Sequence, residues 1–243
     1  MKRRGIITRR QAIVTGLSSL GALMLPGCTK PLPPTYGSIL RMSDNFTYMA
    51  SRALLPGQAM AREYSFADIS SFPAVGTTNP GSLSDEYAKL QNNSFDDYKL
   101  IVEGQVSNPG SYSLTDLMKF TPRTQITKHT CEEGWTAIGE WTGVPLGALL
   151  QHAGIMPSAR FVLFHSFDNA LDSVDLLDAF HPQTLLAYGM NGKTLPIQHG
   201  APLRLRVETQ IGYKSLKYIK KITVSDKFVD YGEDIGWAWY TGI

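Results

Sequence analysis

The chain has 243 residues, 43% of them hydrophobic and 18% charged, which is ordinary for a globular protein with one sizeable core. Five of its 23 basic residues lie within positions 1–27, so 18 basic and 21 acidic residues follow, and this net charge of −3 argues against nucleic acid as a partner. The two cysteines, Cys28 and Cys131, are too few for an iron–sulfur cluster, and the sequence has no Cys-x-x-Cys-His motif for haem attachment.

The first residues have the pattern of an export signal. A basic start with the arginine pair Arg9 and Arg10 precedes a charge-free apolar run from Ala12 to Leu25, which is too short to span a membrane comfortably. Residues 1–27 therefore resemble a twin-arginine signal, which exports folded proteins through the twin-arginine machinery with their cofactor in place. This predicts a periplasmic location. An uncleaved signal anchor and ordinary cleavage nearby are the alternatives.

A short linker is predicted to follow the signal. Leu25 to Cys28 resembles a lipoprotein box, in which the cysteine is lipidated and becomes the new N-terminus. Residues 28–39 contain a proline-rich stretch that is typical of a stiff, extended linker. Such a linker would hold a folded domain, residues 40–243, off the membrane surface.

Strands and short helices intermix in this domain without a regular βαβ rhythm, which predicts an α+β fold. Strands are predicted at residues 98–106, 123–130, 160–167, 185–189, 194–197, 202–207 and 219–224, with Asn191-Gly192 as a hairpin turn. Helices are predicted at residues 51–63, 114–120, 145–153 and 174–180, the second capped by Ser113 and the last by Ser173. Residues 64–92 are rich in Ser, Gly, Pro and Asn and are predicted to be irregular.

The residues around Cys131 are the first candidates for chemistry. Residues 128–135 place this thiol beside a histidine, two carboxylates and a tryptophan, and a thiolate is a soft metal ligand. If Cys28 is lipidated, Cys131 is a single thiol in an oxidising compartment, where it is a liability unless something holds it. The residue types leave four alternatives open: a disulfide with Cys28, an inert buried thiol, a nucleophile with His129 as base, and a zinc site that includes His129.

A second group of candidates is basic. Arg204 and Arg206 fall on one face of the predicted strand 202–207, and its apolar residues fall on the other. Such donors are suited to a phosphate, which an arginine can grip with two parallel hydrogen bonds. The following segment adds four lysines, Lys214, Lys217, Lys220 and Lys221. A solvated strand face is the alternative, and we favour it for the last two lysines.

In order and spacing these stretches resemble the molybdopterin-binding catalytic domain of the sulfite oxidase superfamily, over roughly residues 40–227. The closer likeness is to the periplasmic branch that includes the protein-methionine-sulfoxide reductase catalytic subunit. The resemblance implies a mixed-sheet or barrel-like fold with short helices, and an oxidoreductase that transfers oxygen atoms. It also implies one molybdenum-molybdopterin per chain, with the Cys131 thiolate as the protein's ligand to the metal.

The resemblance extends to individual cofactor contacts. The family's (His/Asn)-Gly-x-Pro-x-Arg run matches His199 to Arg204, and its Gly-aromatic-Lys-x-x-Lys run matches Gly212 to Lys217. A serine stands where the family has a hydroxyl near the cofactor, and residues 43–48 resemble a pterin-contacting run, with an ordinary N-terminal arm as the alternative. The implied contacts are Asp44, Thr47, Tyr48, Cys131, Ser166, His199, Arg204, Ser215, Leu216 and Lys217.

The residues after Cys131 bear on the substrate. The sulfite-oxidising members bind their anion with arginines beside the metal, whereas Glu132, Glu133 and Trp135 follow the cysteine here, a poor site for an anion. We therefore predict a neutral sulfoxide-type substrate such as methionine sulfoxide. Glu133 could tune proton delivery or be a surface carboxylate, and Trp135 and Trp141 could wall the pocket or belong to the core.

Two other functions are alternatives to sulfoxide reduction. Oxidation of sulfite or another small substrate is one alternative, and a non-catalytic binding lipoprotein is the other. Because no haem or cluster motif is present, electrons are expected from outside the chain. A membrane cytochrome b or a c-type cytochrome is the predicted partner.

Overall fold

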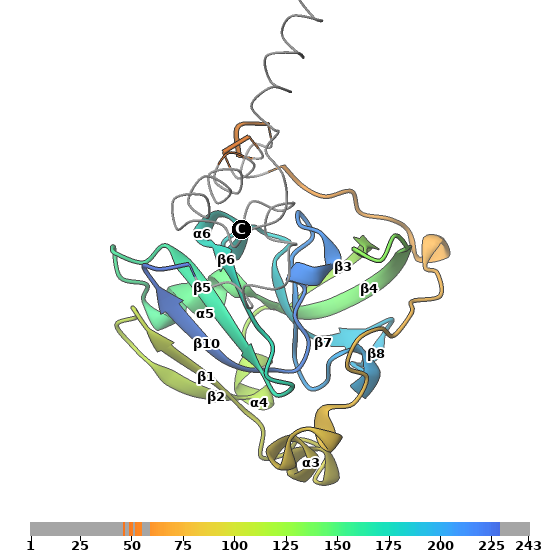
Figure 1. The fold of residues 1–243 in the computed structure, drawn as a ribbon, viewed down its shortest axis with the longest axis horizontal. Helices are drawn as coiled ribbons and strands as arrows, with labels where there is room; N and C mark the ends of the chain where they lie inside the picture. Colours follow the sequence, from red (N-terminus) through yellow and green to blue (C-terminus); the bar gives the residue numbers. More distant parts are fainter. Residues whose placement is uncertain (1–45, 47–48, 51, 55–58, 229–243) are drawn as a thin grey trace, which may run out of the picture. The chain divides into compact units, whose positions relative to one another are not determined.

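Two β-sheets, one mixed and one antiparallel, make up the fold (Figure 1), in a computed structural model that describes residues 46, 49–50, 52–54 and 59–228. The strands found there are Lys99–Gly104 (β1), Gly110–Ser113 (β2), Arg123–Thr130 (β3), Thr136–Pro145 (β4), Phe161–Ser166 (β5), Leu171–Asp175 (β6), Leu185–Met190 (β7), Lys193–Thr194 (β8), Arg204–Arg206 (β9) and Ile219–Ser225 (β10). The helices are Asp85–Asn92 (α3), Leu114–Leu117 (α4), Leu146–Ala153 (α5) and Leu176–Ala179 (α6), with 3-10 turns at Phe66–Asp68 (η1), Pro80–Ser82 (η2), Ile197–His199 (η3) and Gly212–Lys214 (η4).

The two sheets have different strand orders. One runs β2-β1-β10-β5-β6, and in it β1 and β10 are parallel while the other pairs are antiparallel. The other runs β3-β4-β7-β8, with β9 paired to β7, and is antiparallel. Within the described residues neither sheet closes into a barrel. The predicted α+β class with mixed sheets and short helices is confirmed, and the barrel-like form is not what these strands adopt.

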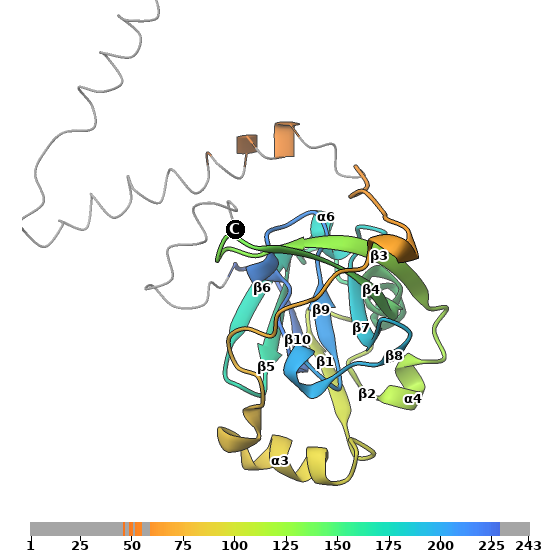
Figure 2. The ribbon, with the colours of Figure 1, turned by 90° about the vertical axis from the view of Figure 1, so that its right-hand side faces the viewer.

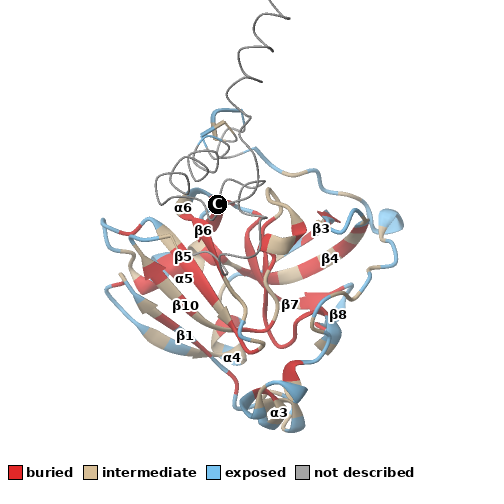
Figure 3. Cartoon of the chain, viewed as in Figure 1, coloured by how far each residue is buried: buried red, intermediate tan, exposed pale blue. Residues whose placement is uncertain are grey.

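Two apolar clusters lie in the described part of the domain, and the larger one contains residues of both sheets. Leu100 and Val102 of β1, Leu149 and Leu150 of α5, and Leu205 of β9 are all completely buried in one cluster. Figure 3 shows the buried residues concentrated along β5, β6 and β7, whereas α3 is largely exposed. β1 and β3 bury alternate side chains, whereas β7 and β9 are buried almost continuously and so on both faces.

Several predicted elements are confirmed. β3 has the predicted bounds, and α5 begins after Pro145 and ends at Gly154, which adopts the left-handed conformation (φ 70°) typical of a helix end. Residues Asn191 and Gly192 both have positive φ and join β7 to β8 as a tight hairpin. Ser113 caps α4 together with Asp116, as the capping-box spacing predicted.

Other elements differ from expectation. Ser173 does not cap a helix; it lies within β6, and the carboxylate of Asp175 caps α6 by accepting a hydrogen bond from the amide of Asp178 at 2.8 Å. The region predicted to be irregular contains α3, which Ser84 caps. Its Tyr87 is buried, and the hydroxyl donates to the carbonyl of Ala201 at 2.7 Å, which fastens α3 to the domain.

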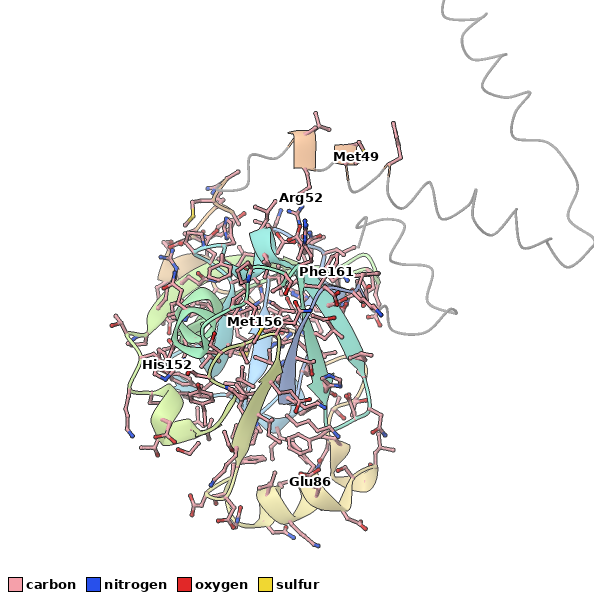
Figure 4. All side chains as sticks on the ribbon, turned by 90° about the vertical axis from the view of Figure 1, so that its left-hand side faces the viewer. Met49, Arg52, Glu86, His152, Met156 and Phe161 are labelled. Carbon is pink, nitrogen blue, oxygen red and sulfur yellow. The ribbon has the colours of Figure 1, made fainter. Side chains whose placement is uncertain are left out.

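The N-terminal predictions fall largely outside the described residues. This applies to the signal (1–27), the linker (28–39) with Cys28, and the candidate contacts Asp44, Thr47 and Tyr48. Arg52 is described, and its guanidinium pairs with Asp175 at 2.9 Å and Asp178 at 2.7 Å. Figure 4 shows Arg52 directed from its helical segment toward the strands. Among the described residues, no helix has the length and apolar character needed to cross a bilayer.

Candidate active site

A cavity of about 210 Å³ brings the two groups of candidates together. Its wall includes Cys131, which follows β3, and Arg204 at the start of β9. The 3-10 turn η3 adds His199, and the segment after η4 adds residues 215–217. Segments far apart in sequence therefore share one cavity, as the sequence predicted.

The turn between β3 and β4 positions the thiol. The amide of Cys131 donates to the carbonyl of Trp135 at 2.9 Å, and Gly134, with φ 91°, allows the chain to reverse within this short span. Cys131 is a free thiol that is only 4% exposed. Burial raises its pKa to about 11, and the neighbouring carboxylates of Glu132 and Glu133 add to the rise.

His129 is held as a neutral ring. Nη1 of Arg206 lies 2.8 Å from Nδ1, and because a guanidinium only donates, Nδ1 must accept. Burial, then the charges of Arg206 and Arg204, lowers the pKa of His129 to about 2. The neutral ring therefore carries its hydrogen on Nε2, which faces Gly212 in the cavity wall. A nucleophilic cysteine with His129 as base is thus disfavoured, since the ring has no free basic nitrogen.

Two cations line the cavity, Arg204 buried and Lys217 half-buried, and neither forms an ion pair with a carboxylate among the described residues. Arg204 donates to the carbonyls of His199 at 2.9 Å and Ser215 at 2.8 Å. Lys217 donates to main-chain carbonyls, among them that of Val75 at 2.8 Å. Burial lowers the pKa of Arg204 to about 9 and that of Lys217 to about 8. An anion placed between them would offset this unfavourable burial of positive charge.

Arg206 differs from Arg204 although both are buried on the same side of β9. Its guanidinium forms a two-point ion pair with Glu208, at 3.0 and 2.8 Å. Both arginines also stack over Trp141, with 4.9 and 4.5 Å from guanidinium carbon to ring centroid. The alternative of a solvated strand face is therefore excluded for Arg204 and Arg206. Trp141 is completely buried and packs against both guanidinium groups, but it does not line the cavity.

The remaining predicted contacts are distributed unevenly. His199, Ser215 and Leu216 line the cavity, and burial lowers the pKa of His199 to about 4. Ser166 is buried but does not line it; its hydroxyl donates to the carboxylate of Asp168, which does. Ser166 therefore lies one layer behind the cavity wall.

Glu133 and the remaining lysines differ in burial and in their position relative to the cavity. Glu133 is exposed at the cavity rim and accepts a hydrogen bond from the indole of Trp135 at 3.0 Å. Lys214 is buried, and its ammonium pairs with Asp172 at 2.7 Å, so it is not a free phosphate donor. Lys220 and Lys221 are half-buried on β10, away from the cavity.

Part of the wall was not predicted. Residues 72–76 line the cavity, and the carbonyl of Val75 among them accepts a hydrogen bond from Lys217. Asp168, Gln198 and Tyr213 also line it. The 72–76 segment lies in the stretch predicted to be irregular, and its short run of one aromatic residue, a proline and small apolar residues gives no periodic signal. Only its packing against the site reveals its role.

A family profile described as the oxidoreductase molybdopterin-binding domain matches residues 87–230. The chain belongs to this family. A putative protein-methionine-sulfoxide reductase subunit YedZ1 from Azospira oryzae is 32% identical over 96% of this chain and 87% of its own length. A protein-methionine-sulfoxide reductase catalytic subunit MsrP from Xanthomonas campestris is 36% identical over 56% of this chain and 46% of its own length.

A solved structure gives the same assignment. The sulfane dehydrogenase SoxCD of Paracoccus pantotrophus aligns with a TM-score of 0.53 and 26% identity, over 55% of this chain and 39% of that one. The alignment with the MsrP relative covers less than half of that protein's length. As a member of the molybdopterin-binding oxidoreductase family, the chain is an oxidoreductase enzyme of the sulfite oxidase type, related to the MsrP proteins.

The residues present fit a molybdopterin cofactor. A soft thiol, the neutral ring of His129, and the cations Arg204 and Lys217, which have no carboxylate partner among the described residues, all line one cavity. Cys131 would ligate the metal, while Arg204 and Lys217 are suited to the anionic end of the cofactor. In the part of the chain that the structure describes, no three His, Cys, Asp or Glu side chains cluster as an ordinary metal site would require.

Proposed function

We propose that this protein is a molybdenum-dependent oxidoreductase that reduces sulfoxide-type substrates, of which methionine sulfoxide is the best example. The observation that carries the proposal is the shared cavity, in which the Cys131 thiol faces the same space as the cations Arg204 and Lys217. The names of the relatives from Azospira oryzae and Xanthomonas campestris support the same substrate. When bound, one molybdenum-molybdopterin per chain supplies the two-electron chemistry that moves an oxygen atom between substrate and water.

The charges around the thiol favour a neutral substrate. Glu132 and Glu133 line the cavity beside Cys131, and the cations of the wall lie in the distant segments that carry Arg204 and Lys217. A sulfite anion on the thiol side would meet these carboxylates in a half-enclosed site, where repulsion is poorly screened. A sulfoxide has no net charge and avoids this penalty.

Glu133 is suited to deliver protons. Reduction of a sulfoxide releases water, so two protons must reach the oxygen that leaves. The Glu133 carboxylate lies at the rim, exposed to solvent on one side and in the cavity wall on the other. The hydrogen bond that the Trp135 indole donates orients one carboxylate oxygen of Glu133. The carboxylate can therefore take a proton from solvent and pass it into the cavity.

The location and the partners follow from the sequence. The arginine pair and apolar run of residues 1–27 support twin-arginine export to the periplasm, and Cys28 supports a lipid tether. Two cysteines and no haem-attachment motif support an external electron donor, a membrane cytochrome b or a c-type cytochrome. Periplasmic fractionation, with labelled palmitate incorporation lost in Cys28→Ala, tests the location.

The direction of the reaction is tested with exported, molybdenum-loaded protein. Methionine sulfoxide with reduced viologen should be turned over, and Cys131→Ala should abolish this activity. Sulfite with ferricyanide is the opposing assay, because the solved relative of this chain is a sulfane dehydrogenase. Turnover of sulfite without turnover of methionine sulfoxide would replace the reductase assignment with an oxidase.

A further inference from the structure

One side of the cavity is built by a segment that precedes the family match. That match begins at residue 87, whereas residues 72–76 line the cavity beside Cys131. In Figure 2 the chain between η1 and α3, drawn in orange, passes along the outside of the strands. We call residues 69–77 the strap.

The strap is fixed to the domain at both ends. Near its start, Ser70 exchanges hydrogen bonds with Ile138 of β4: its amide donates to the Ile138 carbonyl at 3.0 Å, and its hydroxyl accepts from the Ile138 amide at 2.9 Å. At its end, the carbonyl of Thr77 accepts from the hydroxyl of Tyr218 at 2.9 Å and from the ammonium of Lys217. Hydrogen bonds on both sides of residues 72–76 therefore hold this part of the cavity wall against the domain.

Phe72 is the residue that the strap brings to the site. Its ring packs edge-on against Trp135 (5.8 Å between centroids), Trp141 (5.3 Å) and His199 (5.6 Å), and at a tilt against His129 (5.2 Å). It is half-buried, and its remaining surface faces the cavity. Four ring contacts fix its orientation, so it presents a defined apolar surface.

Trp135 presents a second such surface next to the thiol. The hydrogen bond from the Cys131 amide to its carbonyl holds it at the same turn, and its indole is oriented by Glu133. Both Phe72 and Trp135 line the cavity that contains Cys131. The cavity is therefore aromatic beside the thiol, and the cations Arg204 and Lys217 line the same cavity.

We propose that Phe72 is a specificity-determining residue which, with Trp135, receives the alkyl groups on the sulfur of a neutral sulfoxide. Aromatic rings favour contact with alkyl groups and with sulfur, and their negative faces disfavour anions. This inference rests on the proposed sulfoxide reduction and adds the residue that selects alkyl sulfoxides. Phe72 lies in the strap, so the residue that selects the substrate lies outside the part of the chain that matches the family profile, residues 87–230.

Steady-state kinetics of Phe72→Ala test this, with rates expressed per bound molybdenum and reduced viologen as donor. We expect KM for methionine sulfoxide to rise about fivefold with kcat nearly unchanged, because a lost aromatic contact weakens binding before and during reaction alike. KM for dimethyl sulfoxide, whose methyl groups make less contact, should change less. Phe66→Ala is the matched control, because Phe66 is 73% exposed on η1 and should leave KM unchanged.

The variant Phe72→Leu distinguishes loss of the aromatic contact from a folding defect. Leucine keeps an apolar surface, so its KM should lie between those of the wild type and Phe72→Ala, at equal molybdenum content. Equal KM values in Phe72→Ala and Phe66→Ala would overturn the role of Phe72 while leaving sulfoxide reduction intact. Failure of the loaded wild-type protein to turn over any sulfoxide would overturn the proposed function itself, and the inference with it.

Discussion

Arg206 donates from Nη1 to Nδ1 of His129 at 2.8 Å, and this one contact decides what the histidine can do beside Cys131. It leaves the hydrogen on Nε2, which lies against Gly212, so the ring is a donor and not a base for the thiol. Arg206 is in turn neutralised by Glu208, and the three side chains form one buried network. The network positions a donor without adding net charge to the cavity.

Arg206→Met should destabilise the protein strongly. The substitution leaves the Glu208 carboxylate buried without its cation and Nδ1 of His129 without its donor. We expect the free energy of unfolding to fall by about 3–5 kcal/mol, the usual effect of breaking a buried ion pair. Urea unfolding of the apoprotein measures it, and a loss below about 1 kcal/mol would show that the pair is not desolvated.

Arg204→Met should instead affect the cofactor. This side chain donates hydrogen bonds only to carbonyls, so its removal takes away a buried charge that no carboxylate among the described residues pairs with, at the expense of those hydrogen bonds. The free energy of unfolding should change by no more than about 2 kcal/mol. Molybdenum content of the purified protein should fall about tenfold, because a charged donor to the cofactor is lost. Full molybdenum content would remove Arg204 from the binding site.

The buried His199 makes stability depend on pH. Its pKa is lowered from 6.5 to about 4, so between these values the unfolded chain binds a proton that the folded chain does not. The free energy of unfolding should therefore fall as pH decreases through this window, by up to about 1.4 kcal/mol per pH unit from this residue. In His199→Gln the fall between pH 6.5 and 4.5 should be smaller. Identical slopes in both proteins would contradict the lowered pKa.

Gly212 has no room for a side chain. A Cβ there would lie 2.4 Å from Nε2 of His129 and 2.9 Å from the carbonyl oxygen of Thr130. Gly212→Ala should lower the free energy of unfolding by about 1–3 kcal/mol through overpacking and should displace His129. Gly76→Ala is the comparison, because it has a positive φ of 65° but no atom within 4 Å, and should lose only about 1 kcal/mol through backbone strain. Equal losses would refute the close approach.

Elements with a strong local signal could be predicted from sequence. β3 alternates buried and exposed residues over its whole length, and α5 has a proline at its start and a glycine beyond its end. β4 was missed, because Gly139 and Gly143 make it resemble a loop although neighbours on both sides hold it as a central strand. Ser173 was misassigned because pairing with Leu163 of β5 outweighs its capping preference.

Site residues that belong to family motifs could be predicted from the sequence. Residues that reach the site only through tertiary packing could not. Cys131, His199 and Arg204 were expected in one site and line one cavity. Phe72 carries no motif; it acquires its place because Ser70 and Thr77 fasten the strap at either side of it. Such tertiary contacts join residues more than 60 positions apart, which local sequence patterns do not record.

Molybdenum content of folded, exported protein tests the central claim most directly, namely that Cys131 binds the metal of a cofactor held in the shared cavity. Elemental analysis should give about one molybdenum per chain, and Cys131→Ala should lose it while the thermal midpoint of the apoprotein stays close to that of the wild type, since a small side chain is shortened by one atom. Protein that carries zinc or no metal, or Cys131→Ala that retains full molybdenum, would contradict the account.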